Sequence, residues 1–370
     1  MARTEKNERN YGIDALKLAS MLLIVLLHVL GQGGVLGACQ PGSWRYRAAW
    51  LLEIAGYCSV GCFALASGYV QYGRVPKPER LMMLWLQVVF YGLAACVLFR
   101  IFLPGAVRPA DIVCALFPVV TKQYWYFTAY FGLFFLMPVI LHVLNTMDER
   151  AQRRLSAALL ALFCGLPTLQ LARIFFPSLP HADVFVTNNG YSLIWLAALF
   201  YLGGRIRKTA FFAKKSAGTW LLLCLGAIAV TWLSQIAIRA LTLRLHGQSI
   251  DEDFFIRFTS PTVLAASVCL MGFFARLRVG DAAARVLKAL SPLSFGVYLV
   301  HVQPLVWEHV MKGRFAAFAE KPLATMVLCI LSAALAIFLL ALAVDAVRQL
   351  LFRALRVERV CKALCKKLER

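Results

Sequence analysis

Long apolar stretches alternate with short polar segments along almost the whole chain. A helix needs about 20 apolar residues to cross the roughly 30 Å of hydrocarbon in a bilayer, and it satisfies its own backbone polar groups there. By this criterion the pattern predicts an all-α integral membrane protein, a bundle of about ten transmembrane helices. The predicted spans are residues 13–30, 50–72, 81–103, 124–144, 155–176, 190–202, 218–240, 256–275, 289–311 and 322–346.

Composition excludes an ordinary soluble domain. Of the 370 residues, 61% are hydrophobic and only 15% are charged, and the mean hydropathy is +0.72. Residues 1–346 are predicted to form one transmembrane domain, and residues 347–370 a basic amphipathic tail that lies on the inner membrane surface. No predicted loop is long enough for a soluble catalytic domain, so any chemistry is expected inside the membrane body.

The basic residues sort by side of the membrane. The chain has 39 Lys and Arg against 18 Asp and Glu, a formal net charge of +21. Of the 39, 26 fall in segments on the side of the N-terminus and only 8 in segments on the other side. This positive-inside pattern predicts a multi-pass protein of the cell (inner or plasma) membrane with both termini cytoplasmic. The charge therefore indicates topology and attraction to membrane lipid, and gives no support for a nucleic-acid partner.

Cysteine spacing gives no sign of a disulfide framework. The eleven cysteines are odd in number, lie mostly within predicted spans and show no ligand spacing with the histidines. Cys58 and Cys62, one helical turn apart, are interpreted as packing residues, with a soft metal as the less favoured alternative. We therefore expect no metal in this protein.

The first predicted span carries ionisable residues, which are expensive in a membrane and mark candidate functional sites. Lys17 and His28 are eleven positions apart, which leaves them about 20° apart around a helix and roughly 16 Å apart along it. Asp14, three residues before Lys17, falls within salt-bridge reach on the same face. A near-neutral imidazole can take a proton from a hydroxyl, and a fixed cation can bind an anionic ligand. We expect both groups to point into one shared cavity.

Simpler explanations exist for these residues. A lone lysine near a helix end usually extends to the membrane surface, and a lone histidine often bonds to a neighbouring helix. A secretory signal is another alternative, because the sequence LGAC at residues 36–39 has the form of a lipoprotein cleavage site. Cleavage before Cys39 would remove His28 altogether.

Several stretches, taken in order, carry a resemblance to a known family. The first is a basic residue, ten others and then histidine in the first span, here Lys17 and His28. The second is SVGCFALASGY, residues 59–69, with an aromatic residue followed by Ser-Gly. Ala64 stands where the family commonly has a second aromatic residue, and lysine replaces its more usual arginine at position 17.

Later spans continue the same pattern. YWYFTAYFGLFFLMP, residues 124–138, places Trp125 before a terminal proline, and NNGYSLIWLAALFYLGGRI and LSPLSFGVYLVH follow in order. Together these stretches resemble the acyltransferase-3 family of integral membrane O-acyltransferases, which includes O-acetyltransferases of bacterial surface polysaccharides. The resemblance covers nearly the whole chain.

The resemblance implies an acyl-CoA donor, most simply acetyl-CoA, in the cytoplasm and a hydroxyl acceptor on a glycan or lipid-linked sugar at the outer side. It implies His28 as general base or as covalent carrier of the acyl group. Four basic residues are expected to bind the anionic donor: Lys17, Arg74, Lys77 and Arg80. Six residues are expected to bind the acceptor or shape its site: Glu53, Ser67, Trp125, Tyr126, Asn189 and His301.

Several of these assignments have alternatives. Glu53 would otherwise form an inter-helix ion pair with Arg100 or Arg173, and His301 would make a helix-to-helix hydrogen bond. The oxyanion donors are open, with Tyr126, Ser67 and backbone amides as candidates. At the level of function, ten spans with internal charges would also suit a transporter or flippase of a lipid-linked glycan, or a membrane scaffold.

Overall fold

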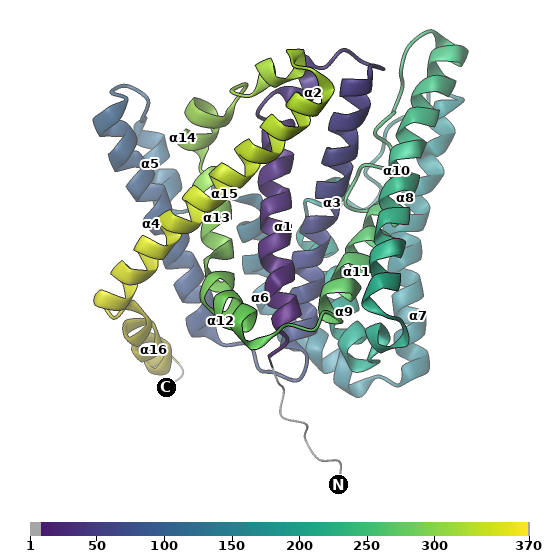
Figure 1. The fold of residues 1–370 in the computed structure, drawn as a ribbon. Helices are drawn as coiled ribbons and strands as arrows, with labels where there is room; N and C mark the ends of the chain where they lie inside the picture. The colour runs from purple at the N-terminus through teal and green to yellow at the C-terminus, as the bar shows by residue number, and fades with distance from the viewer. Residues whose placement is uncertain (1–8, 369–370) are drawn as a thin grey trace.

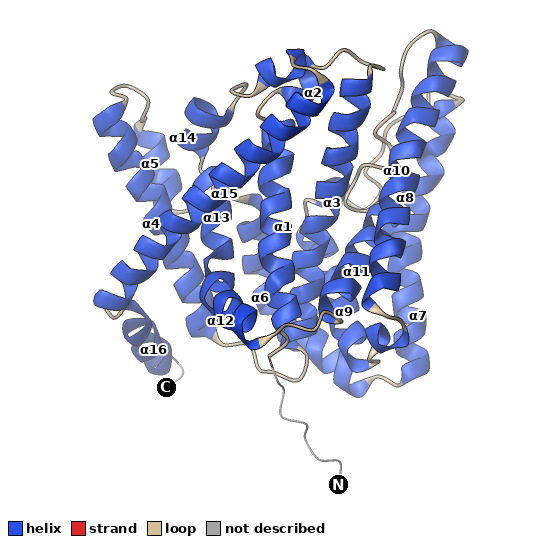
Figure 2. Cartoon of the chain, viewed as in Figure 1, coloured by secondary structure: helices blue, strands red, loops and turns tan. Residues whose placement is uncertain are grey.

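The structure is a computed structural model that describes residues 9–368, and its regular elements in that range are all helices (Figure 2). Eight helical segments of the described chain are long and apolar enough to cross a membrane, and two of them, Glu149–Ile174 and Asp281–His301, are runs of consecutive shorter helices. Two further predicted spans correspond to shorter helices, α9 (Leu193–Lys208) and α11 (Pro261–Ala275). The predicted fold class is confirmed: the chain is a multi-pass helical membrane protein.

The other helices have the following bounds: α1 Tyr11–Leu30, α2 Val35–Ala38, α3 Trp44–Gln71, α4 Pro78–Phe102, α5 Pro109–Leu116, α6 Trp125–Thr146, α7 Glu149–Leu160, α8 Leu166–Thr168, α10 Ala217–His246, α12 Asp281–Leu290, α13 Ser294–His301, α14 Pro304–Val306, α15 Leu323–Ala354 and α16 Val357–Leu368. Short 3-10 turns and two π-helical turns, Ala161–Gly165 and Trp307–Met311, connect several of them.

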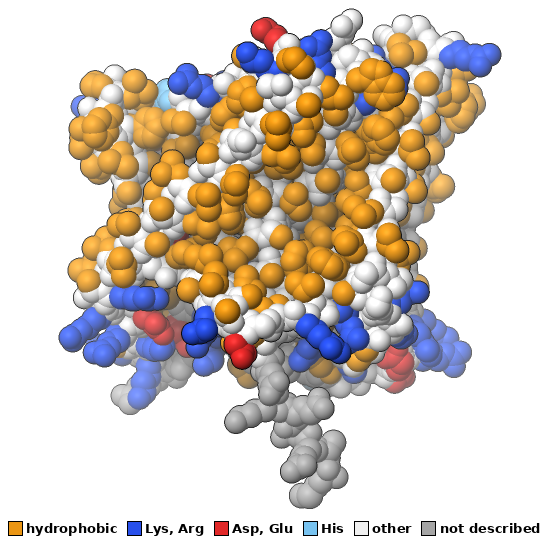
Figure 3. All heavy atoms as spheres, in the orientation of Figure 1, with side chains coloured by type: hydrophobic (Ala, Val, Ile, Leu, Met, Phe, Trp, Pro, Cys, Tyr) orange, Lys and Arg blue, Asp and Glu red, His pale blue; other side chains and the backbone are white. Residues whose placement is uncertain are grey.

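Helix α1 runs through the middle of the bundle and packs against α3, α11, α13 and α15, with α15 crossing it obliquely (Figure 1). The start of α1 and the whole of α16 lie at the same end of the molecule. Lys and Arg side chains line this end below a broad hydrophobic band (Figure 3). We call it the basic end. The hydrophobic band is the surface expected to contact lipid.

Local sequence explains where α1 begins and ends. Asn10 is its N-cap, and the side-chain oxygen of Asn10 accepts a hydrogen bond from the Ile13 amide at 3.3 Å. The helix is apolar on all sides except for its ionisable residues, as expected for a span enclosed by other helices. It ends before a glycine-rich turn in which Gly34 has φ +92°, a conformation that glycine adopts without strain.

Two of the family-like motifs pack directly against each other. A Cβ atom on Gly68 of α3 would lie 1.9 Å from the Phe200 carbonyl oxygen, and one on Gly203 of α9 would lie 2.0 Å from the Leu65 carbonyl oxygen. The backbones of α3 and α9 therefore touch, which only glycine permits, as in other close helix pairs in membranes. The Ser-Gly-Tyr and Leu-Gly-Gly motifs thus meet as two halves of one interface.

The structure differs from the predicted spans in two places. Residues 289–311 do not form one helix, because α13 ends at His301 and the Gln303 side chain caps α14 by accepting from the amides of Leu305 and Val306. Pro304, which has no amide hydrogen, begins that short helix. The last span is longer than predicted, since α15 continues to Ala354 before α16 begins.

Candidate active site

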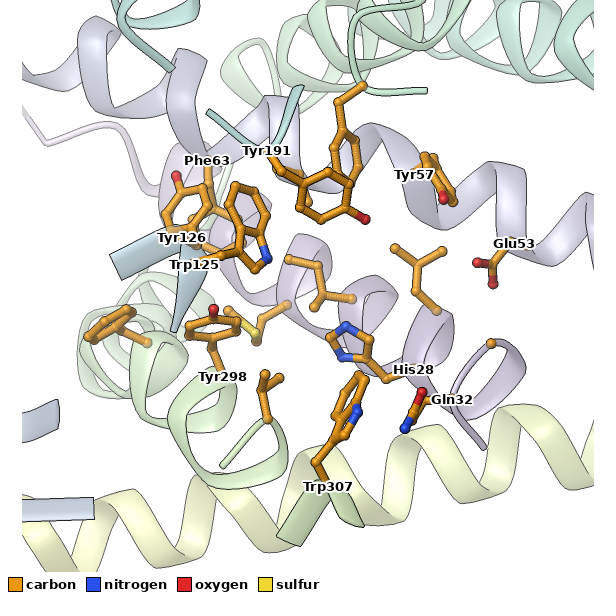
Figure 4. Close-up of a pocket in the computed structure, with 18 residues that line it drawn as sticks. His28, Gln32, Glu53, Tyr57, Phe63, Trp125, Tyr126, Tyr191, Tyr298 and Trp307 are labelled. Carbon is orange, nitrogen blue, oxygen red and sulfur yellow. The ribbon is translucent and has the colours of Figure 1, made fainter. Parts of the chain in front are cut away.

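A cavity of about 320 Å³ lies beside α1 in the interior of the bundle. Its walls are mostly apolar and aromatic, and the polar side chains His28, Gln32 and Glu53 project into it (Figure 4). The rings of Phe63, Trp125, Tyr126 and Tyr191 gather on the side away from Glu53, and Tyr57 lies nearer to it. A concave apolar site with a few convergent polar groups is the usual form of a small-molecule binding site. We call it the central cavity.

A second histidine fixes the protonation of His28. The His28 Nδ1 atom lies 2.8 Å from His301 Nε2, and His301 Nδ1 lies 2.5 Å from the Val297 carbonyl oxygen. Because a carbonyl only accepts, neutral His301 donates from Nδ1 and accepts at Nε2, so His28 donates from Nδ1. His28 Nε2 is then left with a lone pair. This is the form of imidazole that a general base or nucleophile requires.

Packing holds the two rings in place. His301 is 1% exposed and lies on α13, next to the point where that helix ends. The Trp307 ring meets the His28 ring edge to face, with 4.7 Å between centroids and 80° between planes. Trp307 lies beyond the break that follows His301, so the interruption of the predicted ninth span puts two side chains of that segment against His28.

Glu53 is a buried carboxylate on α3 that faces the central cavity. It is 8% exposed, and its Oε2 atom has no hydrogen-bond partner among the residues that the structure describes. The alternative ion pair with Arg100 or Arg173 is wrong, because Arg173 pairs with Asp251 at 2.9 Å and Arg100 is exposed on the outside of α4. A buried acceptor without a partner is costly, so a polar ligand in the cavity would satisfy it.

Aromatic rings in mutual contact form one wall of the central cavity. Tyr191 packs between Trp125 and Phe258, with centroids 4.6 and 4.8 Å apart, and Tyr57 continues the row 5.1 Å from Phe258. Asn189 does not reach the cavity: its side chain is exposed, and its carbonyl accepts from the Phe258 amide at 3.1 Å. The predicted acceptor residue therefore acts through its main chain, by fixing the loop that carries Phe258.

A second pocket of about 240 Å³ opens at the basic end of α1. Lys17, Arg9 and Arg74 line it together with Arg207 from the end of α9. Among the described residues that line the pocket, Asp14 is the single carboxylate; it lies 3.5 Å from Lys17 Nζ and 2.6 Å from Arg9 Nε. The ion pair between Asp14 and Lys17 that the spacing predicts is present. Because cations outnumber the carboxylate among these described residues, the pocket is suited to an anion. We call it the basic pocket.

Further contacts order the basic pocket. Ser291 donates a hydrogen bond to Asp14 Oδ1 at 2.9 Å, which ties α1 to the turn before α13. The Arg207 guanidinium lies over the Tyr69 ring, 5.0 Å from its centroid, and donates to the Tyr69 hydroxyl at 3.0 Å. The contact with Tyr69 therefore fixes the Arg207 guanidinium at the edge of the pocket, where its charge favours an anionic ligand.

The structure separates what the sequence predicted as one shared cavity. Lys17 lines the basic pocket, whereas Met21, the next residue on the same face one turn later, lines the central cavity with His28. Ser20 is fully buried between them. Lys17 and His28 thus occupy two pockets that follow one another along α1, and neither side chain is directed at lipid.

Besides Asn189, four predicted residues line neither pocket: Lys77, Arg80, Ser67 and His301. Lys77 is the N-cap residue of α4 and is exposed, and Arg80 is exposed in the first turn of that helix. Ser67 lies one turn beyond Phe63 on α3, outside the central cavity. Trp125 and Tyr126 do line the central cavity, and His301 lies behind its lining, against His28 and Tyr298. The remaining donor-site prediction, Arg74, lies in the basic pocket.

Sequence reasoning missed several lining residues. Gln32 follows His28 by four positions and Tyr57 follows Glu53 by four, so helical spacing alone would have placed both on the cavity face. Arg9 precedes α1, and Arg207 lies in the last turn of α9. The sequence pattern uses both residues only as indicators of which side of the membrane their segments occupy. Phe258 and Trp307 come from segments that only the tertiary structure brings to the site.

Comparison with known proteins gives one match. The model of a family described as an acyltransferase domain matches residues 10–342, which include α1, both predicted histidines and every transmembrane helix up to most of α15. No curated protein and no solved structure matches the chain.

Proposed function

This chain belongs to the acyltransferase-3 family of integral membrane acyltransferases, and on that premise we propose that it is an O-acyltransferase with acyl-CoA as donor. The acyl group is most simply acetyl, and the acceptor is a hydroxyl of an extracytoplasmic glycan or lipid-linked sugar. In this proposal the basic end faces the cytoplasm and the host membrane is the cell membrane, in keeping with the distribution of Lys and Arg.

One observation carries the proposal: two pockets of opposite character follow one another along a single helix. The basic pocket holds Lys17 at the start of α1, and the central cavity holds His28 near its other end. The rise between the two residues is roughly 16 Å. A donor with a charged nucleotide, a long flexible arm and a reactive thioester needs this sequence of environments.

The basic pocket would bind the phosphates of CoA. Lys17, Arg74 and Arg207 supply positive charge, and Asp14 holds Lys17 in position. The pantetheine arm would then follow α1 past Ser20 and deliver the thioester to the central cavity. The acyl carbonyl would come to rest beside His28.

His28 would perform the chemistry. As the acceptor hydroxyl oxygen bonds to the thioester carbonyl carbon, His28 Nε2 takes the hydroxyl proton. The tetrahedral intermediate collapses with cleavage of the carbon–sulfur bond, and the departing thiolate recovers the proton from His28. In the covalent alternative Nε2 attacks the carbonyl first and passes the acyl group to the acceptor afterwards. In either route His301 keeps the Nδ1 proton of His28 in place and so leaves Nε2 available.

The acceptor would lie against the aromatic wall. Sugar rings present apolar faces that pack on aromatic side chains such as Trp125 and Tyr191, and hydroxyls that need acceptors. Glu53 and Gln32 offer those acceptors within the same cavity. Tyr126 is the candidate donor to the oxyanion, since Ser67 lies outside the cavity.

The proposal is tested with inverted membrane vesicles that contain the chain, incubated with acetyl-CoA labelled in the acetyl group and a mixture of candidate glycans. We expect label to move into glycan, and CoA with a free thiol to appear in equal amount. Vesicles without the chain are the control. Movement of glycan across the vesicle membrane without covalent label would contradict the proposal and support a flippase instead.

A further inference from the structure

A third hollow, of about 430 Å³, lies at the basic end but apart from α1. It is a groove between α4, the end of α15 and α16, and shares no lining residue with the basic pocket or the central cavity. Of the residues described there, four arginines line it, Arg348, Arg353, Arg356 and Arg359, and Glu358 is the one carboxylate. We call it the arginine groove. Nothing in the proposed reaction uses it.

Most of the positive charge in the arginine groove is not neutralised by the protein. Arg348 pairs with Asp345 through two contacts of 2.8 Å, and Glu358 pairs with Lys362 at 2.6 Å. Arg353, Arg356 and Arg359 are exposed and form no ion pair within the range that the structure describes. Like charges this close repel one another, so an anion between them would stabilise the groove.

The groove is built on a rigid base. Asp345 is fully buried and also accepts hydrogen bonds from Tyr91 at 2.7 Å and from Gln87 at 3.1 Å, both on α4. This network fixes Arg348, and with it the spacing between α4 and α15. On the other side α16 packs against α4 through buried Cys361, whose Sγ lies 3.5 Å from Met83 Sδ. Both walls of the groove are therefore held in position.

The surroundings of the groove show which kind of anion fits. It lies where the hydrophobic band meets the basic end, at the lower corner of the molecule that α15 and α16 form (Figures 1 and 3). Exposed apolar side chains at the end of α15 adjoin the arginines: Leu351 is 42% exposed and Leu355, the residue that follows the helix, 63%, and Phe352 lines the groove itself. A ligand that carries a phosphate and hydrocarbon chains would satisfy both surfaces, whereas a free phosphate would leave the apolar side chains in water.

We propose that the arginine groove is a binding site for the phosphate headgroup of an anionic phospholipid, which α16 and α15 hold against α4. The arginines contact the phosphate oxygens, and the acyl chains lie along the exposed apolar face of α15. The bound lipid fastens the amphipathic α16 to the bundle. This site is independent of the acyltransferase reaction, because it involves none of the residues proposed for donor, acceptor or catalysis.

The test is native mass spectrometry of the full chain in detergent, titrated with phosphatidylglycerol and, separately, with phosphatidylcholine. We compare the wild type with R353Q/R356Q/R359Q. The matched control is R150Q/R153Q/R154Q, which removes the same charge from exposed positions on α7. We expect one phosphatidylglycerol per chain at low concentration in the wild type and the control. In the groove variant its affinity should fall at least about tenfold, the loss equivalent to one charge-assisted contact.

Competition experiments distinguish a phospholipid headgroup from other phosphate-containing ligands. Inorganic phosphate and CoA are each added as competitors, and neither is expected to displace the lipid. Equal binding of phosphatidylcholine, displacement by CoA, or an equal loss in the two triple variants would overturn the proposal. The single variant R359Q, at an exposed position of α16, is expected to weaken binding in the same direction; unchanged affinity in R359Q and in the triple variant would also overturn it.

Discussion

The two pockets along α1 differ in the way that they gain specificity. In the basic pocket charged side chains reach solvent, and Lys17 and Arg9 share one carboxylate at 3.5 and 2.6 Å. In the central cavity His28 has no charged partner and depends on a neutral histidine and an aromatic ring. A solvated ion cluster attracts a charged ligand but positions it loosely, whereas enclosed hydrogen bonds fix one proton arrangement. Changes in the first pocket should therefore affect donor binding, and changes in the second should affect turnover.

The largest effect is expected from His28→Ala. Loss of the base or nucleophile should lower kcat for acyl transfer by about 10³-fold and leave the KM for acyl-CoA almost unchanged. His142→Ala is the matched control, because His142 is exposed on α6 and lines neither pocket. Both variants are assayed with labelled acetyl-CoA at equal expression. Normal turnover by the His28→Ala protein would remove the central cavity from the reaction.

The next largest effect is expected from His301, a positioning residue that acts through His28. His301→Leu fills the space but accepts no hydrogen bond, so His28 loses its fixed tautomer and kcat should fall about a hundredfold. His301→Gln supplies a carbonyl oxygen that can accept from His28 Nδ1, and it should restore a large part of the rate. Equal activity of the two variants would show that His301 serves packing alone.

Lys17→Gln tests the basic pocket, and it should affect binding of the donor more than turnover. We expect the KM for acyl-CoA to rise about tenfold, the value of one charge-assisted contact, with kcat nearly constant. Lys77→Gln removes the same charge from the exposed N-cap of α4, outside the basic pocket, and should change neither constant. The measurement is initial rate against acyl-CoA concentration. If Lys17→Gln lowers kcat and leaves KM unchanged, the assignment of donor binding to the basic pocket and of turnover to the central cavity is wrong.

The smallest effect is expected outside both pockets, where Glu252 ties the loop after α10 to α3. Burial works against ionisation of Glu252, but hydrogen bonds from Tyr46, Arg239 and Ser249 outweigh it and hold the Glu252 pKa below its ordinary value. A carboxyl whose pKa is lower in the folded state stabilises the fold above its unfolded pKa, and this contribution is lost as pH falls through the folded value.

Glu252→Gln should therefore lower the thermal unfolding midpoint by a few degrees at neutral pH. The difference from the wild type should disappear in acid, as pH falls below the ordinary range for glutamate. Thermal unfolding of the detergent-solubilised protein across this pH range provides the measurement, and Glu320→Gln at an exposed position is the control. A difference that persists unchanged in acid would mean that the Glu252 contacts stabilise the fold through packing and not through charge.

Local features of the fold and the site were predictable from the sequence. Helix geometry alone brings Asp14 within reach of Lys17, and apolar length alone marks most of the spans. The end of α13 at His301 was missed because hydropathy stays high through that region, although Pro304 gave a signal of interruption.

Non-local features were not predictable. His28 and His301 are 273 positions apart, so their hydrogen bond depends on how α1 and α13 pack. The sequence identified both as intramembrane histidines but offered a cavity role and a helix contact for His301 as equals. Likewise Glu53 was expected in the acceptor site, with an ion pair to Arg100 or Arg173 as the alternative, and spacing could not show that Arg173 pairs with Asp251 and that Arg100 is exposed. Which partner a buried polar group meets is decided by tertiary packing and not by spacing.

The glycine contact between α3 and α9 limits how the interior can change shape. With backbones touching at Gly68 and Gly203, the two helices are too close to slide past each other and can move only as one rigid unit. Tyr57, Phe63 and Tyr69 all belong to that unit and line the two pockets. This wall of the path from the basic end to the central cavity therefore keeps a fixed position. Any widening needed to admit a bulky donor must then come from the helices on the opposite side of the path.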